Sequence, residues 1–256
     1  MCATFDLDFY DLRYHGDFEY YLDGYIYFFS AYEKKELFLL RDLVADIPDS
    51  VFVDVGANSG QHSLYLAQYW RQIHAFEPYA EVRQPLDAGI ELNQLKNIAV
   101  HPVALGAEDK QLDFYAHKGC NTGTESFLSK HEAENDEWVA QLQVIHGDAH
   151  IESLALGRID AIKIDVESFE KNVLLGLWQA LAKYRPSVLM ECSPSAQQTF
   201  ADLDELRSLL PAAYEILTVN PHNKVFGIFS TSSYQLIDFS HPGSDLNILL
   251  RPCKGG

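Results

Sequence analysis

Two apolar stretches of the chain each end in an acidic residue, and a glycine-rich turn follows the first of them. The first stretch and its turn read VFVDVGANSG, from Val51 to Gly60, and the second reads HAFEP, from His74 to Pro78. In a βαβ unit, this pattern joins a strand to a helix and places an acid about 20 residues beyond the turn, where it accepts the hydroxyls of a ribose. The spacing therefore predicts a nucleoside-binding cleft with Glu77 at the ribose.

The residues of the turn, Gly56 to Gly60, indicate which nucleoside cofactor fits. A dinucleotide-binding turn has a second glycine where this chain has Asn58, because the backbone must approach a pyrophosphate there. The side chain of Asn58 occupies that space, so a cofactor with adenosine but no phosphate fits better, and S-adenosylmethionine is the common one. We expect its carboxylate to use the free N–H groups of the helix that begins near Ser59, and Asp54 to attract its ammonium group.

Further acids end predicted strands later in the chain. Asp165 ends IKID, with Glu167 just beyond it, and Glu191 ends SVLME. Because an open parallel sheet binds its ligands at the carboxyl ends of the strands, these side chains are expected at the same rim as the first two acids. Methyl transfer to an unactivated hydroxyl needs a base, and Asp165 or Glu191 could serve if burial and mutual repulsion raise its pKa. His222, in the late turn NPHN, is a weaker candidate and is more simply a turn residue that faces solvent.

The same carboxylates would also suit a divalent cation. Asp165, Glu167 and Glu191 offer oxygen ligands of the kind that Mg²⁺ prefers, and a bound Mg²⁺ would orient and acidify an acceptor hydroxyl. Cys192, directly after Glu191, is a soft ligand that adds nothing to such a site. We therefore expect no bound metal and keep metal-assisted O-methylation as an alternative.

Predicted strands and helices alternate between residues 51 and 210. The strands are expected at Val51–Val55, Ile73–Phe76, Ile98–Val103, Ala161–Asp165 and Ser187–Glu191. The helices are expected at Gly60–Trp70, Tyr79–Lys96, Phe169–Tyr184 and Ala196–Leu210. Apolar strands separated by helices predict an α/β fold with a mostly parallel central sheet and helices on both faces. Consecutive strands follow at Tyr214–Val219, Lys224–Ser230, Tyr234–Phe239 and Asn247–Leu250 and predict an antiparallel hairpin at the end of this sheet.

Residues 1–50 precede this alternation and are expected to form a cap or substrate flap. The first thirty are aromatic and acidic without a clean period, which predicts irregular structure with short helical or strand pieces, and a helix is expected over Tyr32–Asp46. The segment carries many tyrosines, namely Tyr14, Tyr20, Tyr21, Tyr25 and Tyr27. These rings could line a substrate pocket, but packing on the main domain is the simpler expectation.

The main domain is expected over residues 51–256, with a long insertion at about 112–156. The insertion is far longer than an ordinary connection between a strand and its neighbour. We expect a polar loop in it, an acidic helix around His131–Leu142 and a strand at Gln143–His146, together forming a lid over the cleft.

The composition of the chain argues against two classes of partner, nucleic acid and membranes. The 256 residues carry 19 basic against 37 acidic side chains, a formal net charge of −18, so the basic patch that nucleic-acid binding needs is absent from the pattern. No apolar run approaches the roughly 18 residues of a membrane helix. The acidic start lacks a signal or transit pattern and the four cysteines lack CxxC spacing, which together favour a reducing cytoplasm. The expected partner is thus a small-molecule acceptor, not nucleic acid or a membrane.

Taken in order, these segments resemble the FkbM-type methyltransferases, a family of S-adenosylmethionine-dependent enzymes. The matching stretches run from about Phe38 to Cys192 and read VFVDVGANSG, HAFEP, ELNQLKNIAVHPVALG, DAIKIDVESFEKNVLLG and RPSVLMEC. The resemblance implies a Rossmann-like class I methyltransferase fold. It also assigns the cofactor site: the methionine part to Asp54, Gly56, Asn58 and Gly60, the ribose to Glu77, and the adenine to the region of Ala104 and Leu105.

The resemblance implies O-methylation of a hydroxyl on a sugar, a glycan or a natural product, and one residue departs from the family pattern. Ser168 stands after DVE, where the family usually has glycine, so the loop backbone there could differ. Two alternatives remain open. A nicotinamide-dependent oxidoreductase could use the same glycine turn, although the middle glycine and a Tyr-x-x-x-Lys pair are missing. A cofactor-binding homologue could have lost its chemistry, with Ser168 as the sign of that loss.

Overall fold

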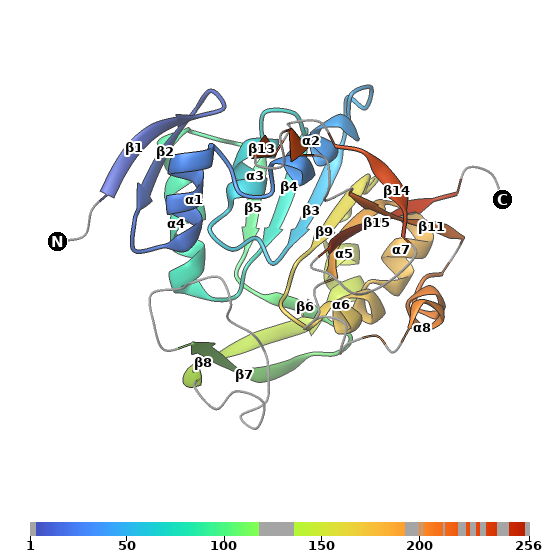
Figure 1. The fold of residues 1–256 in the computed structure, drawn as a ribbon. Helices are drawn as coiled ribbons and strands as arrows, with labels where there is room; N and C mark the ends of the chain where they lie inside the picture. Colours follow the sequence, from blue (N-terminus) through green and yellow to red (C-terminus); the bar gives the residue numbers. More distant parts are fainter. Residues whose placement is uncertain are drawn as a thin grey trace.

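An eight-stranded sheet forms the centre of the molecule in a computed structural model that describes residues 4–117, 136–192, 200, 202–211, 213–219, 224–225, 229–230, 234–239 and 246–253 (Figure 1). The sheet order is β14-β11-β15-β10-β9-β3-β4-β5. The strands are β3 (Val51–Val55), β4 (Gln72–Phe76), β5 (Ile98–His101), β9 (Ala161–Ile164), β10 (Ser187–Cys192), β11 (Tyr214–Val219), β14 (Leu236–Asp238) and β15 (Leu246–Pro252). The five from β5 to β10 are parallel, and β15, β11 and β14 continue the sheet antiparallel. The predicted mostly parallel sheet with an antiparallel end is confirmed.

Helices cover both faces of this sheet because alternate residues of its buried strands point to opposite sides. In β3, Val51, Val53 and Val55 pack in one cluster with α5 (Gly147–Ser153), α6 (Glu170–Gly176), α7 (Trp178–Tyr184) and α8 (Leu203–Ser208). Phe52 points the other way and packs with α2 (Lys34–Asp42) and α3 (Gln61–Leu66). On that same side, α4 (Ala80–Leu92) inserts Leu86 against Ala75 of β4. The layered Rossmann-like arrangement expected from the sequence is thus present.

Several predicted helices are shorter in the structure than in the sequence pattern. The helix expected over Tyr32–Asp46 spans only α2, and the one expected over Phe169–Tyr184 is divided at Leu177 into α6 and α7. The helix expected from Ala196 is described as α8 alone. Near the end of the chain, the strand expected over Lys224–Ser230 is described as β12 (Lys224–Val225) paired with β13 (Phe229–Ser230).

The N-terminal segment is regular rather than irregular, which corrects the expectation. Strands β1 (Thr4–Phe9) and β2 (Leu12–Asp17) form an antiparallel hairpin, followed by α1 (Tyr21–Phe29). Phe9, Tyr14 and Ile26 are buried in the cluster that also contains α2 and α3. The Tyr14 hydroxyl donates to Asp23 at 2.5 Å and so fastens the hairpin to α1. The segment therefore packs on the α3 side of the sheet.

In the part that the structure describes, the insertion contributes two strands to a second, small sheet, and the strand expected at Gln143–His146 is the end of one of them. Strands β7 (Lys110–His117) and β8 (Asp136–His146) pair antiparallel, and β6 (Ala104–Gly106) adds in parallel to β8. The acidic helix expected around His131–Leu142 is wrong from residue 136 on, and residues 118–135 lie outside the described residues. Buried Leu142 and Val144 alternate with exposed Gln141 and Gln143, a period of two that belongs to a strand.

The order of the strands determines where ligands bind. Strand β3 lies between β4, which follows it in sequence, and β9, which begins a hundred residues later, so the connections on its two sides run in opposite directions. Helices that leave the sheet in opposite directions open a crevice at the carboxyl ends of such strands. A ligand crevice is therefore expected at the carboxyl ends of β3, β4, β9 and β10.

Candidate functional site

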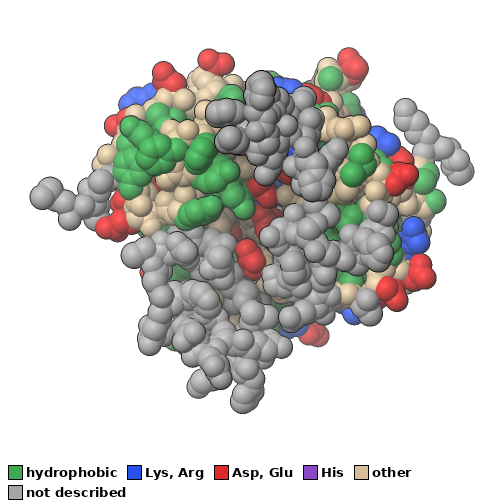
Figure 2. Space-filling model, in the orientation of Figure 1, with side chains coloured by type: hydrophobic (Ala, Val, Ile, Leu, Met, Phe, Trp, Pro, Cys, Tyr) green, Lys and Arg blue, Asp and Glu red, His purple; other side chains and the backbone are tan. Residues whose placement is uncertain are grey.

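A cavity of about 260 Å³ opens at this edge of the sheet. Acidic side chains are visible near the centre of this face of the molecule in Figure 2. Eight of the predicted site residues line the cavity: Gly56, Asn58, Glu77, Ala104, Leu105, Asp165, Glu167 and Glu191. Two others, Asp54 and Gly60, are not among the lining residues. The sequence thus identified eight of the ten predicted site residues correctly as lining residues, and they come from five separate segments of the chain.

Both glycines of the turn are required by the backbone itself. Gly56 and Gly60 have φ angles of 82° and 86°, a region that favours glycine. A Cβ on Gly56 would lie 1.8 Å from the carbonyl oxygen of Asp165, and one on Gly60 would lie 2.4 Å from the side chain of Leu86. The N–H groups of Gly56 and Ala57 both donate to the Phe76 carbonyl at 3.0 Å, which holds the turn against β4. The glycines therefore allow the turn to pack closely, whatever ligand the cavity holds.

Glu77 connects the turn to the loop after β4. Its Oε2 accepts the N–H of Asn58 and its Oε1 accepts the N–H of Tyr79, both at 3.0 Å. Asn58, with a φ of 52°, accepts the N–H of Ser59 on its own Oδ1 at 2.6 Å. That N–H, which we expected to be free for a ligand carboxylate, is therefore already bonded. The Ser59 hydroxyl oxygen, in contrast, is buried without a hydrogen-bond partner among the described residues.

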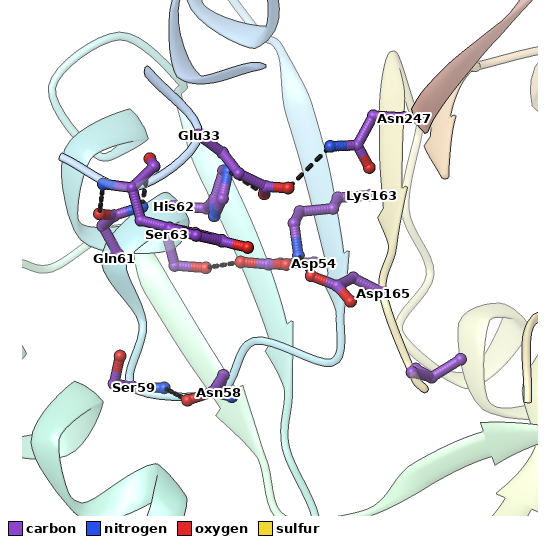
Figure 3. A network of polar contacts seen from close by, with 12 residues as sticks. Glu33, Asp54, Asn58, Ser59, Gln61, His62, Ser63, Lys163, Asp165 and Asn247 are labelled. Atoms are coloured by element: carbon purple, nitrogen blue, oxygen red, sulfur yellow. Dashed lines mark hydrogen bonds and ion pairs between the residues drawn. The ribbon is translucent and has the colours of Figure 1, made fainter. Parts of the chain in front are cut away.

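Asp54 lies beneath the cavity rather than in its wall. Its side chain is fully buried, and its Oδ2 accepts the Ser63 hydroxyl at 2.6 Å (Figure 3). Burial raises the pKa of Asp54, and the charge of Lys163 opposes that rise. Its second oxygen, Oδ1, has no hydrogen-bond partner in the described structure. The contact expected between Asp54 and a cofactor ammonium stays a prediction.

Asp165 and Glu191, at the ends of β9 and β10, form a pair whose pKa values shift in opposite directions. Although burial raises the pKa of Asp165, the Lys163 ammonium 2.8 Å from its Oδ2 brings the pKa below its usual value. Burial and the charge of Asp165 raise the pKa of Glu191, and the two side chains share a hydrogen bond. At neutral pH these shifts favour the carboxylate form of Asp165 and the carboxyl form of Glu191. This is the separation of pKa values that acid–base chemistry uses.

Glu167 completes this acidic group. One oxygen from each of Asp165, Glu167 and Glu191 lies within 4.8 Å of the others, close enough for all three to approach one ligand. Glu167 and Ser168 have φ angles of 47° and 74°, and Glu170 Oε1 accepts the Ser168 N–H at 3.2 Å. Ser168 therefore adopts a backbone that a glycine would adopt without strain. The departure from the family glycine leaves the left-handed loop conformation in place.

Several lining residues were not predicted from the sequence. The polar ones include Tyr32, Glu33, His62 and Lys163 (Figure 3 shows the last three). Lys163 could have been predicted from the sequence, because a lysine within a four-residue buried strand requires a charged partner. His62 and Glu33 depend on how α3 and the loop before α2 pack. Of the tyrosines considered for a pocket, Tyr21 lines the cavity, while Tyr14 is buried in the N-terminal packing.

Two further expectations cannot be placed. His222 and the NPHN turn lie outside the described residues, as do Cys2 and Cys120. Cys192 is buried and Cys253 exposed, and both are free thiols. Within the described part of the chain, we find no helix with the length and hydropathy needed to span a membrane.

Comparisons with known proteins agree on one class of domain. A family model described as "Methyltransferase FkbM domain" matches residues 54–216. AMB antimetabolite synthetase AmbE of Pseudomonas aeruginosa is 30% identical over 71% of this chain, and Methyltransferase 1 of Beauveria bassiana is 28% identical over 56%. The chain matches 10% of the first of these proteins and 65% of the second. The crystal structure of methyltransferase FkbM from Methylobacillus flagellatus has a TM-score of 0.48 and 17% identity, over 79% of this chain and 43% of that one.

Proposed function

The chain belongs to the methyltransferase FkbM domain family, and from this premise we propose that it transfers a methyl group from S-adenosylmethionine to a hydroxyl of a small molecule. The observation that supports the proposal is the pair of acids, Asp165 and Glu191, at the ends of β9 and β10. They lie beside a cavity whose lining residues suit a nucleoside. Fold alone does not select a reaction, and this arrangement of side chains supports the proposal of transfer to a hydroxyl. The sugar, glycan or natural product that accepts the methyl group is inferred from the family resemblance.

The residues at the cavity wall fit the cofactor. Apolar groups from Phe76, Ala104 and Leu105 stand on the β4 and β5 side and offer an adenine a flat, dry surface. Glu77 lies at the end of β4, where ribose hydroxyls would donate to it. The buried Ser59 hydroxyl without a partner provides a polar atom that a ligand would satisfy. We assign adenine, ribose and methionine in this order across the sheet, from β5 towards β3 and β9.

The acceptor then occupies the side of Asp165, Glu167 and Glu191. The bound cofactor supplies an electrophilic methyl group on a sulfonium, so the acceptor oxygen forms a bond to carbon as the carbon–sulfur bond breaks. Asp165 is the ionised member of the pair, so the hydroxyl proton passes to its carboxylate. The ion pair with Lys163 keeps Asp165 ionised and also lowers its strength as a base. Alignment of the acceptor in a cavity that excludes water supplies much of the remaining acceleration.

Cofactor binding and methyl transfer test this proposal separately. S-adenosylhomocysteine should raise the melting temperature of the purified protein and NAD should not, because only a ligand that binds the folded state stabilises it. Incubation with methyl-labelled cofactor and a panel of hydroxylated small molecules should then label an acceptor at oxygen. Stabilisation by NAD instead would favour the oxidoreductase. Binding of S-adenosylhomocysteine with no transfer to any acceptor of the panel would favour the non-catalytic homologue.

A further inference from the structure

Glu33, which precedes α2, is held in the cavity by contacts with two other elements. The amide of Gln61 in α3 accepts the Tyr32 N–H at 2.7 Å and donates to the Tyr32 carbonyl at 3.0 Å. Asn247 of β15 donates to Glu33 Oε1 at 2.7 Å. Glu33 itself has a φ of 46°, which is uncommon for a residue with a side chain. Strained backbone that its surroundings hold in place is concentrated at functional sites.

His62 faces Glu33 across a gap. Its Nε2 lies 3.7 Å from Glu33 Oε2, beyond hydrogen-bond distance, although the side chains are only 9% and 19% exposed. The buried Nε2 has no hydrogen-bond partner among the described residues, and both side chains line the cavity. Burial lowers the pKa of His62, so its imidazole is neutral. Figure 3 shows both side chains, with Glu33 bonded to Asn247. Since His62 Nε2 and Glu33 Oε2 do not bond to each other, a ligand in the cavity could satisfy both.

The position of these groups indicates which part of a ligand they would contact. Glu77 lies at the end of β4, whereas His62 and Glu33 lie on the other side of the glycine turn, near Lys163 of β9. A cofactor whose ribose is at Glu77 therefore extends its amino-acid part over β3 towards Glu33. Asp54 is fully buried and is not among the lining residues, whereas Glu33 and His62 are.

We propose that Glu33 and His62 bind the amino-acid end of S-adenosylmethionine, with Glu33 accepting the ammonium group in the role first expected of Asp54. The assignment rests on the proposed function. His62, with its proton on Nε2, donates to the carboxylate of the same methionine. The charges near Glu33 support the assignment. Burial and the charge of Asp165 raise the pKa of Glu33. The nearby ammonium of Lys163 is already paired with Asp165. A ligand ammonium would supply the positive charge that an ionised Glu33 lacks.

A comparison of two ligands tests this contact without a turnover assay. S-adenosylhomocysteine carries the amino-acid end, and 5′-methylthioadenosine has the same adenine and ribose but lacks that end. By isothermal titration, Glu33→Gln should weaken S-adenosylhomocysteine by roughly tenfold or more, the loss of one charge-assisted hydrogen bond, and leave 5′-methylthioadenosine within about twofold. The glutamine retains an oxygen for Asn247, so the loop should stay in place.

His62→Gln is the second variant and should show the same selective loss, which keeps the test available if Glu33→Gln does not fold. Glu77→Ala serves as the matched control, because it should weaken both ligands. Equal weakening of both ligands by Glu33→Gln, or of neither, would overturn the assignment. If the unmodified protein binds 5′-methylthioadenosine and S-adenosylhomocysteine equally tightly, the amino-acid end is not recognised and the assignment also fails. Failure of the unmodified protein to bind either ligand would instead overturn the proposed function itself.

Discussion

At the scale of single residues, the environment of each carboxylate determines its role. Glu77 accepts two backbone N–H groups, Asp165 faces the ammonium of Lys163, and Glu191 shares a proton with Asp165. The sequence shows only that all three follow apolar strands. The contacts that give the three acids different environments come from Lys163, two residues before Asp165, and from loops that come together only in the folded chain. Each role therefore leads to a different expected result when the acid is replaced.

Replacing Glu191 with glutamine should reduce turnover and preserve cofactor binding. The substitution retains the size of the side chain but leaves Asp165 without the partner that shares its proton. General-base catalysis contributes roughly 10²–10⁴-fold, so kcat should fall by about 10²-fold or more. The affinity for S-adenosylhomocysteine should stay within about threefold, because Glu191 lies on the acceptor side. Single-turnover kinetics and titration check the two halves, and a variant with full kcat would show that Glu191 does not assist proton removal.

Replacing Glu77 with alanine should weaken every ligand that carries the ribose. The change would remove the proposed acceptor of the ribose hydroxyls, and it releases the N–H groups of Asn58 and Tyr79. Hydrogen bonds to a charged group contribute about 1.5–3 kcal/mol, so affinity should fall by roughly tenfold or more. Titration with 5′-methylthioadenosine measures the loss directly. Unchanged affinity would place the ribose away from β4.

Removal of divalent metal should leave activity intact. The oxygens of Asp165, Glu167 and Glu191 lie close enough for a cation, but Lys163 already stands 2.8 Å from Asp165 and neutralises that carboxylate. A cation would have to compete with this ion pair. Initial rates measured after exhaustive chelation, and again after addition of Mg²⁺, should agree. A rate that is lost with the chelator and restored by Mg²⁺ would support the metal-assisted alternative.

At the scale of elements, the sequence predicted segments whose pattern is local and missed those that depend on packing. Strands β3, β4, β9 and β10 were predicted within a residue or two because their residues are apolar and punctuated by glycine or an acid. The β1 strand carries a period of two in Phe5, Leu7 and Phe9, but the surrounding aromatics hide it. Glu33 and His62 had no signal, since the α1–α2 loop and the first turn of α3 meet only in the folded chain.

A row of three histidines beside the site makes the β4–β5 region sensitive to acid. His74 Nδ1 lies 3.0 Å from His101 Nε2, and His101 Nδ1 lies 3.2 Å from His150 Nε2. Burial lowers the pKa of all three, that of His101 to about 4, and neighbouring imidazoles add to the effect for His74 and His101. Each donor and acceptor in this row depends on neutral rings.

The free energy of unfolding should therefore fall as the pH drops from about 6.5 towards 4. Above pH 6.5 the histidines are neutral in both states, so they add no pH dependence. Below pH 6.5 the histidines of the unfolded chain bind protons, whereas their lowered pKa values keep the folded rings neutral. Protonation therefore favours the unfolded state. Urea denaturation across this range checks the slope, and His101→Gln should flatten it. An identical slope in the variant would exclude the histidine row as its source.

At the scale of the whole molecule, the charge determines which acceptors can approach. The chain has a net charge of −18, and carboxylates from four segments line its cavity: Glu33, Glu77, Asp165, Glu167 and Glu191. Exposed negative charge repels polyanions over about 10 Å at moderate salt and farther at low salt. A neutral or cationic small molecule meets no such barrier. The acidic cavity and the net charge of the chain thus both favour the proposed small-molecule acceptor over a polyanion.

We therefore expect the protein not to bind RNA or DNA. Non-specific binding of nucleic acid comes from lysines and arginines that displace phosphate counterions, and its affinity rises steeply as salt is lowered. Fluorescence anisotropy of labelled single- and double-stranded RNA should stay flat up to about 10 μM protein at low salt, where a basic methyltransferase would bind. Preincubation with S-adenosylhomocysteine controls for a site that forms only with cofactor. Saturable binding that weakens as salt is added would reveal a local basic surface, and a nucleic-acid acceptor would then replace the small molecule.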